Sequence, residues 1–343
     1  MPEKQIHNRN YCIDFLKGIA CICVVFMHCE FPGKFGILVQ CVSRFCVPFF
    51  FMVSGFFVYR EETQYTCSTP QYRKILHILK ITIFASIFYF VIEIVKYIIT
   101  GNMIVITKKH ILYWILFNQP CIIAGQLWFL FALLYVYIIF AFVQRFNLYR
   151  LSYIFIPILI LGYIVLAQGM HLVGKSVPNM IYRNFLFEGF PFFMLGHFFH
   201  YKEERICNYF KNPVLLILLI AFTLMCVLER FLLGRDFGVN ICTFPQVTCL
   251  FILGMKNASL FEHNILRKLG TNLSMFVYVI HPFVWHSMEY GYIKFQIDDN
   301  IIALYLMPIF VLLFTTVLSI CLYFILKMKH TKIKVSRNNE KSV

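Results

Sequence analysis

Two apolar stretches near the start of the chain decide its fold: DFLKGIACICVVFMHCEFPGKFG, residues 14–36, and SRFCVPFFFMVSGFFVYR, residues 43–60. Each contains a run long enough to cross a bilayer as a helix, which needs about 20 mostly apolar residues. Both also carry ionisable side chains, which cost roughly 2.5–3.5 kcal/mol each at the centre of a membrane helix. These residues are therefore candidates for a functional site, and we expect the rest of the chain to hold the two segments in a membrane.

The composition of the whole chain indicates a membrane protein. Of its 343 residues, 60% are hydrophobic and only 14% are charged, and the mean hydropathy is +0.74. A soluble domain of this length would need a more polar surface. Apolar runs of about 18 or more residues recur along the chain, which is typical of membrane helices. The predicted fold is all-α: a polytopic transmembrane helical bundle in a cell membrane, plasma or inner.

The hydropathy pattern predicts about ten membrane spans. They lie near residues 13–31, 44–60, 76–99, 125–144, 151–169, 182–200, 213–233, 238–255, 271–290 and 302–326. An even number places both termini on the same side. If that side is cytoplasmic, the cytoplasmic segments hold 21 of the 31 Lys and Arg residues, as the positive-inside rule expects. The longest connection on the other side, 100–124, contains Lys108–Lys109 and Trp114 and is expected to lie along the membrane interface.

The sequence predicts one integral membrane domain, residues 1–326, followed by a basic cytoplasmic tail, residues 327–343, that is expected to be disordered. Topology signals explain the formal net charge of +15 better than nucleic-acid binding does. The thirteen cysteines form no C-x-x-C pair and lie mostly inside apolar runs. Neither disulfides nor a metal site are therefore expected.

The ionisable residues of the first two stretches form the candidate site. His28 lies about 15 residues into the first predicted helix, or about 22 Å along it, and so in the outer half of the membrane. Its imidazole titrates near neutral pH and can accept a proton from a hydroxyl nucleophile. Glu30 follows just before Pro32, where the helix should end, and could orient the histidine. The structural alternative is a histidine that only hydrogen-bonds a neighbouring helix.

Three other charged residues of the same two stretches are candidates. Asp14 and Lys17 are three residues apart at the start of the first helix, so they can share a face and neutralise each other. Helix-end electrostatics and topology explain this pair at least as well as binding of an anionic ligand does. Arg44, at the predicted outer start of the second span, either snorkels to the interface or belongs to the ionisable cluster around His28.

Further basic residues precede the third predicted span in QYRKILHILK, where Arg73, Lys74, His77 and Lys80 recur at three- and four-residue steps. Several of them therefore share a helix face. Topology signalling and binding of the phosphates of a nucleotide-like donor explain this pattern equally well. His281, followed by a proline, falls within the ninth predicted span. A proline there frees a backbone carbonyl and can kink the helix, so His281 could line a cavity.

Taken in order, these motifs resemble the acyltransferase-3 superfamily of multi-pass membrane acyltransferases, many of which O-acetylate surface polysaccharides. The resemblance rests on DFLKGIACICVVFMHCEF, SRFCVPFFFMVSGFF and YRKILHILK. It continues with LWFLFALLYVY from Leu127, NFLFEGFPFFMLGHFF from Asn184 and LGTNLSMFVYVIHPFV from Leu269. Together the motifs follow the family's order and cover nearly the whole chain.

The resemblance implies that His28 is catalytic and that acyl-coenzyme A donates the acyl group from the cytoplasm. It also implies that Arg44 and the run Arg73–Lys80 bind or orient the donor or the acceptor. Two positions depart from the family pattern: Lys17 stands where arginine is usual, and Lys74 and His77 align with an R-x-x-R pair. Lysine keeps the charge but loses the bidentate fork of arginine, so the departures concern how the donor is bound.

The expected activity is therefore transfer of an acyl group, in particular acetyl, to a hydroxyl of a cell-surface or lipid-linked glycan. The expected donor is acetyl-CoA or another acyl-CoA, with no tightly bound cofactor. The expected partners are this donor, the glycan or lipid-linked saccharide, and membrane lipid. The expected catalytic residues are His28 and Glu30, and the expected substrate- and donor-binding residues are Asp14, Lys17, Arg44, Arg73, Lys74, His77 and His281.

Two alternatives come from other functional classes. A transporter or flippase for a lipid-linked glycan could use the same ionisable cluster as a proton relay. A structural subunit of a glycan-assembly complex would need none of these residues for chemistry. Acetyl-CoA turnover distinguishes the enzyme from both alternatives.

Overall fold

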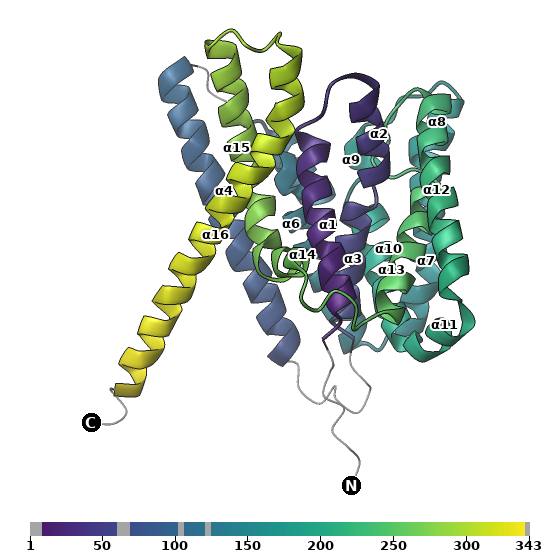
Figure 1. Ribbon diagram of the computed structural model, residues 1–343. Helices are drawn as coiled ribbons and strands as arrows, with labels where there is room; N and C mark the ends of the chain where they lie inside the picture. Colours follow the sequence, from purple (N-terminus) through teal and green to yellow (C-terminus); the bar gives the residue numbers. More distant parts are fainter. Residues whose placement is uncertain (1–8, 60–68, 102–105, 121–124, 340–343) are drawn as a thin grey trace. The chain divides into compact units, whose positions relative to one another are not determined.

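The computed structural model describes residues 9–59, 69–101, 106–120 and 125–339, and within these ranges the protein is helical without any strand. Seven helical segments in the described ranges are long and apolar enough to cross a membrane. They are Tyr11–His28, Gly33–Phe56, Tyr72–Thr100, Gly125–Arg145, Tyr149–Leu172, Asn212–Leu233 and Ile301–Met328. The prediction of an all-α protein with several membrane-length helices is confirmed (Figure 1).

The helices belong to two compact units. The first consists of Met1–Cys46 together with Asn257–Val343, and the second of Val47–Lys256. In the first unit lie α1 (Tyr11–His28), α2 (Gly33–Ser43), α14 (Ile265–Lys268), η5 (Leu269–Leu273), α15 (Ser274–Lys294) and α16 (Ile301–Asn339). α3 (Cys46–Phe56) begins at the boundary. The two ends of the chain thus build one unit, which contains both His28 and His281.

The second unit contains the remaining described helices. They are α4 (Thr69–Thr100), α5 (Lys108–Phe117), η2 (Gly125–Leu127), α6 (Trp128–Arg145), α7 (Tyr149–Ile164), η3 (Val165–Gly169), α8 (Met170–Leu172), α9 (Asn179–Tyr182), η4 (Phe185–Gly189), α10 (Phe190–Tyr201), α11 (Glu203–Tyr209), α12 (Asn212–Leu233) and α13 (Thr243–Lys256). Within it, α12 packs on α13, α10 on α7 and α4 on α6. Glu229 of α12 accepts hydrogen bonds from the backbone N–H groups of Ile241 and Cys242, 2.8 and 3.1 Å away, and so fixes the connection to α13.

Close helix packing in the first unit depends on two glycines. α1 packs along α14 and η5 (Figure 1). A Cβ atom at Gly18 would lie 2.1 Å from the carbonyl oxygen of Leu266, and one at Gly270 would lie 2.0 Å from that of Asp14. Because no side chain fits at these distances, glycine lets the two backbones touch, as small residues do where membrane helices meet.

The second span begins earlier than predicted. The expected start at residue 44 is wrong, because α2 and α3 together form one membrane-length segment, Gly33–Phe56, that is interrupted at Arg44–Phe45. Pro32 precedes α2 with the extended backbone of an N-cap. Gly36 lies inside α2, where a Cβ atom would be 1.8 Å from the carbonyl oxygen of Phe31.

Three predicted spans, 182–200, 238–255 and 271–290, are not among the seven segments in the described ranges. The first is divided into α9, η4 and α10, the second reduces to the 14 residues of α13, and the third is η5 with α15, which carries His281, His286 and Glu289. The count of about ten spans and the cytoplasmic side of the termini stay predictions. Residue 326 lies within α16, so the predicted division between domain and tail does not coincide with a helix end.

Candidate active site

Two histidines from opposite ends of the chain meet in the first unit. His28 is the last residue of α1, and His281 lies in the middle of α15, directly before Pro282. Their ring centroids are 5.2 Å apart, with 31° between the ring planes. His28 is half-buried and His281 is 0% exposed. α1 and α15 pack against each other, so the pairing follows from the fold of the unit.

The hydrogen bonds of His281 define which of its nitrogens is available. Nδ1 lies 3.0 Å from the backbone carbonyl oxygen of Val277, which can only accept, so Nδ1 carries the proton in the neutral ring. Nε2 is then a hydrogen-bond acceptor. It is buried, and no described residue donates to it. A buried polar atom without a partner is rare in a folded protein and calls for an explanation, such as a ligand group that donates to it.

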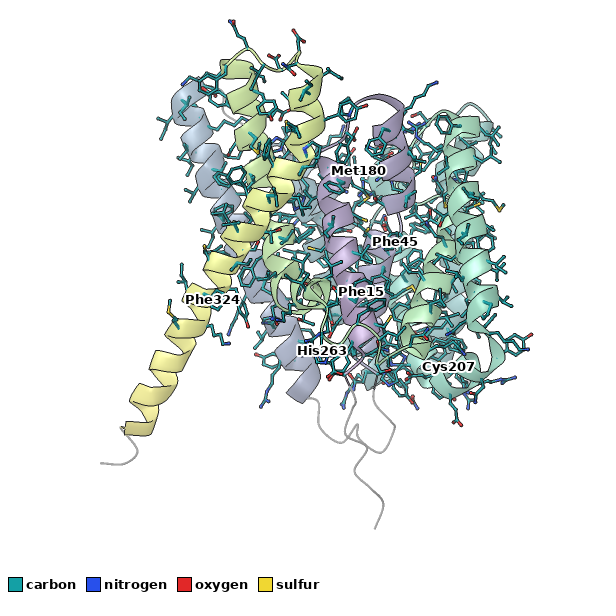
Figure 2. All side chains as sticks on the ribbon, in the orientation of Figure 1. Phe15, Phe45, Met180, Cys207, His263 and Phe324 are labelled. Atoms are coloured by element: carbon teal, nitrogen blue, oxygen red, sulfur yellow. The ribbon has the colours of Figure 1, made fainter. Side chains whose placement is uncertain are left out.

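Arg44 lies beside the turn of α1 that carries His28. One guanidinium nitrogen, Nη1, is 3.9 Å from the sulfur of Met27, the residue before His28. Arg44 occupies the interruption between α2 and α3, just before Phe45 (Figure 2), and not the start of the span as predicted. Inside a membrane, the backbone groups that such an interruption frees can stabilise a charge, as other polar groups can. Snorkelling to the interface and membership of the ionisable cluster around His28 both stay predictions for Arg44.

A match with a known family now adds to this geometry. Residues 10–328, nearly the whole chain, match the acyltransferase-3 family, whose description is "Acyltransferase domain". The chain belongs to this family. It is a membrane acyltransferase. No curated protein and no solved structure matches the chain significantly.

The turn after His28 contains the second predicted catalytic residue of this acyltransferase. Glu30 is exposed between α1 and α2, so its role as the group that orients His28 stays a prediction. Cys29, between the two, is buried. Burial raises the pKa of its thiol from 9.0 to about 12, and the carboxylates of Glu289 and Glu30 act in the same direction. A thiol that stays protonated is a poor nucleophile, so Cys29 is not suited to carry the acyl group.

Asp14 and Lys17 lie at the opposite end of α1 from His28. Asp14 is buried and forms ion pairs with Arg9, 2.8 Å away, and with Lys17, 3.7 Å away. The helix is capped by Asn10, whose side chain accepts from the N–H of Ile13 at 2.8 Å. Asp14 therefore holds two cations at the start of α1 in this acyltransferase, and its role in donor binding stays a prediction.

Two further basic residues join this end of α1 and were not singled out in the sequence. Arg267 and Lys268 form the last turn of α14, which packs on α1. The guanidinium carbon of Arg267 lies 5.1 Å from the ring centroid of Tyr11, and its buried Nε has no hydrogen-bond partner among the described residues. With Arg9 and Lys17 they form a basic cluster. The sequence shows that Arg267 and Lys268 precede a predicted span, but it does not show which helix they contact.

Arg73, Lys74 and His77 belong to α4 in the second unit, and the structure does not bring them together with the histidine pair within one unit. Arg73 and His77 are exposed one turn apart. Lys74 donates a hydrogen bond of 2.8 Å to the carbonyl oxygen of Phe57, just past the end of α3. Lys74 thus satisfies a backbone group at a helix end. Among the described residues, no group of three or more His, Cys, Asp or Glu side chains is arranged to hold a metal ion.

Proposed function

We propose that this membrane acyltransferase moves an acyl group, in particular acetyl, from acyl-CoA to a hydroxyl of a cell-surface or lipid-linked glycan, in the plasma or inner membrane. The observation that supports this most directly is the pair His28–His281 with the acceptor nitrogen of His281 buried beside it. A general base and a second acceptor atom a short distance away suit a sugar, which presents adjacent hydroxyls.

In the proposed reaction His28 is the general base. The acceptor hydroxyl donates a hydrogen bond to His28, loses its proton to the imidazole and attacks the carbonyl carbon of the thioester. A C–O bond forms and the C–S bond breaks. The coenzyme A thiolate leaves and takes the proton from the His28 imidazolium, which restores the neutral base. Proton and charge balance without any other reactant.

His281 and Arg44 have supporting roles in this proposal. Nε2 of His281 accepts a hydrogen bond from a second hydroxyl of the acceptor, which pairs an atom that is otherwise unsatisfied. The guanidinium of Arg44 stabilises the negative charge that develops on the thioester oxygen, an interaction that strengthens as the transition state forms. Both residues touch substrate, whereas Asp14 only positions the neighbouring cations.

The donor is proposed to enter from the other end of α1. The cluster of Arg9, Lys17, Arg267 and Lys268 supplies the positive charge that coenzyme A phosphates require. Lys17 and His28 are eleven residues apart, or about 16 Å along a helix. An extended pantetheine arm lying along α1 would bring the thioester from the predicted cytoplasmic end toward His28. The predicted placement of His28 in the outer half of the membrane is compatible with a cytoplasmic donor in this way.

Purified enzyme with acetyl-CoA and an acceptor oligosaccharide tests the proposal. We expect release of free thiol coupled to an alkali-labile ester on the sugar. His28→Ala should lower the rate by roughly 10²–10⁴-fold while the protein keeps its elution volume and helix content. The exposed histidine His263 is the matched control, and His263→Ala should be unchanged. Substrate movement across the membrane without thiol release would contradict acyl transfer and favour a transporter.

A further inference from the structure

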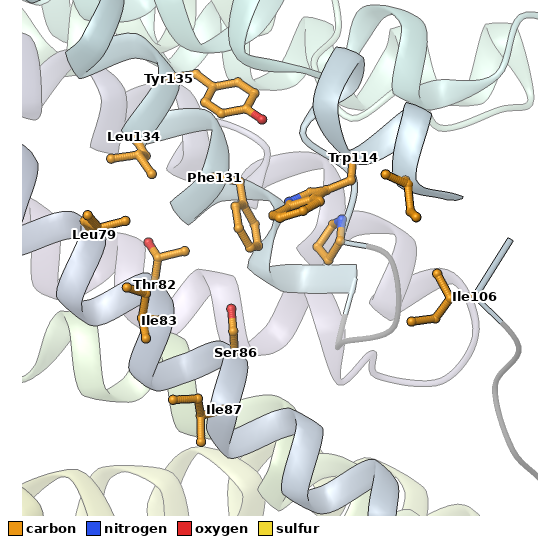
Figure 3. A pocket seen from close by; sticks show the side chains of 12 residues that line it. Leu79, Thr82, Ile83, Ser86, Ile87, Ile106, Trp114, Phe131, Leu134 and Tyr135 are labelled. Atoms are coloured by element: carbon orange, nitrogen blue, oxygen red, sulfur yellow. The ribbon is translucent and has the colours of Figure 1, made fainter. Parts of the chain in front are cut away.

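An apolar groove opens between three helices of the second unit. It has a volume of 560 Å³ and is lined from α4, α5 and α6 (Figure 3). The lining includes Ile83 and Ile87 from α4, Trp114 from α5 and Phe131 from α6. Trp114 and Phe131 meet edge to face at 5.7 Å between ring centroids and close one wall. The groove matches a hydrocarbon chain because aliphatic and aromatic side chains dominate its surface.

The hydroxyl groups in the groove do not change this character. Thr82 donates to the backbone carbonyl oxygen of Ile78 at 2.9 Å, so its hydrogen-bonding capacity is used within α4. Ser86 and Tyr135 contribute the other two hydroxyls of the lining (Figure 3). Isoleucine side chains of the lining are half exposed, 50% for Ile83 and 58% for Ile87. Surface of this kind is stable beside a lipid tail and costly in water.

A pair of lysines lies where the groove meets α5. Ile106 and Ile111 both line the groove, and Lys108 and Lys109 lie between them in the chain. Lys108 is also three residues before Ile111, so these two share a face of α5. Both lysines are exposed, and the ammonium of Lys109 is 5.4 Å from the ring centroid of Tyr113. Lys108 therefore borders the groove, whereas Lys109 lies on the face of α5 with Tyr113, away from Ile111 and Trp114.

The position of these lysines calls for a local explanation. They lie in the connection predicted to be non-cytoplasmic, where the positive-inside rule disfavours Lys and Arg. The adjacent His110 is occupied, because its Nδ1 accepts the N–H of Thr107 at 3.3 Å in the capping box of α5. The rim thus offers one ammonium group, that of Lys108, which pairs with negative charge.

We propose that this groove is a binding site for an anionic phospholipid of the bilayer, with a hydrocarbon chain in the groove and the headgroup phosphate beside the ammonium of Lys108. The geometry combines the two features that such a lipid requires, an apolar channel and a cationic rim. This site is separate from acyl transfer and does not depend on the proposed function. Basic residues near a membrane surface bind anionic lipids in this way.

Quenching of Trp114 fluorescence tests the proposal in the full-length protein. The enzyme is reconstituted into phosphatidylcholine bilayers that contain increasing dibrominated phosphatidylglycerol, and the same titration with Trp114→Phe isolates the signal of this one tryptophan. We expect strong quenching at low mole fractions of phosphatidylglycerol. When phosphatidylcholine carries the bromine and phosphatidylglycerol does not, quenching of Trp114 at the same mole fraction of brominated lipid should be weaker. Lys108→Gln should raise the midpoint roughly fivefold, and Lys109→Gln, on the other face of α5, should raise it less.

Two variants separate the groove from general charge effects. Ser86→Phe fills the groove and should reduce the maximal quenching of Trp114 by phosphatidylglycerol. Lys294→Gln, at the end of α15 in the first unit, removes one lysine elsewhere and should leave the midpoint unchanged. Equal quenching by the two brominated lipids would overturn the proposal. In protein with unaltered helix content, a Ser86→Phe variant with unchanged quenching would also overturn it. So would a shift of the midpoint in Lys294→Gln as large as that in Lys108→Gln.

Discussion

His281 illustrates what a single residue contributes to this enzyme. Its backbone hydrogen bond to Val277 fixes the ring and leaves Nε2 as a buried acceptor. The centroid of this ring lies 5.2 Å from that of His28. A neutral imidazole held in one tautomer recognises a donor such as a hydroxyl. The sequence suggested that His281 lines a cavity, because a proline follows it, but gave no partner for it.

Removing the His281 acceptor should therefore weaken binding of the acceptor sugar. We expect His281→Ala to raise KM for the acceptor by roughly 2- to 10-fold, the value of one hydrogen bond between uncharged groups, with little change in KM for acetyl-CoA. Steady-state kinetics with each substrate varied in turn measures this. The control is His286→Ala, an exposed residue of the same helix. A rise in the KM for acetyl-CoA alone would contradict the assignment.

Arg44 should act on the rate of the chemical step. Arg44→Gln removes the charge beside the last turn of α1 and should lower kcat by roughly 10²–10³-fold, as loss of one oxyanion-stabilising group does. Arg44→Lys keeps a charge without the planar fork, so its kcat should lie between those of the unaltered enzyme and Arg44→Gln. Single-turnover rates with saturating donor measure the step. Lys34→Gln, an exposed basic residue of α2, is the comparison; a fall of the same size in that variant would refute a local role for Arg44.

At the scale of elements, the site depends on how closely α1 can approach α14 and η5. The backbone of α1 lies against that of α14 at Gly18 and against that of η5 at Gly270. This contact holds the start of α1 against the segment that continues into α15, the helix that carries His281. It also brings Arg267 and Lys268 to the start of α1.

A side chain at either glycine should destabilise the first unit. Gly18→Val and Gly270→Val place methyl groups against backbone carbonyls, and overpacking of this kind costs about 1–3 kcal/mol. We expect a lower thermal unfolding midpoint in detergent, followed by tryptophan fluorescence, together with lower activity. Gly291→Ala in α15 is the matched control, because a Cβ atom there meets no atom within 4 Å. Its midpoint should stay the same or rise, and equal losses at all three positions would disprove the packing argument.

At the scale of the whole molecule, the proposed reaction assigns different tasks to the two ends of α1. The basic cluster of Arg9, Lys17, Arg267 and Lys268 lies at one end and His28 at the other. In the proposed reaction the donor enters at the basic end, and the acceptor is modified near the end with His28. The enzyme would then transfer the acyl group in one direction across the membrane.

Sided proteoliposomes test this arrangement. Vesicles are sorted by the accessibility of an N-terminal tag, and acetyl-CoA is supplied only outside. We expect turnover in vesicles whose N-terminus faces outward, with ester formed on oligosaccharide trapped inside, because the donor site and the start of α1 lie on the same side. Vesicles with the opposite orientation serve as the control and should be inactive until permeabilised. Full activity in both orientations would rule out separate access from the two sides.

Much of the fold could be predicted from particular residues, and some of it could not. The long apolar runs of α1, α4 and α12 identified these helices, because burial in lipid depends on composition over one helix length. The predicted start of the second span at Arg44 was wrong. α2 already begins after Pro32, and its Gly36 packs against the carbonyl of Phe31, a contact that only the structure shows. Likewise, the break at Arg44 has no signal in hydropathy.

The sequence by itself determined the helical class, the membrane environment and the acyltransferase family, and it singled out His28 as the candidate base, since each depends on local composition or on a continuous motif. Only the tertiary structure decided that His281 lies beside His28, that Arg44 lies in an interrupted helix, and that Arg267 and Lys268 meet the start of α1. These pairings join residues far apart in the chain. They depend on which backbones can approach most closely, and that is a property of packed surfaces that no single segment contains.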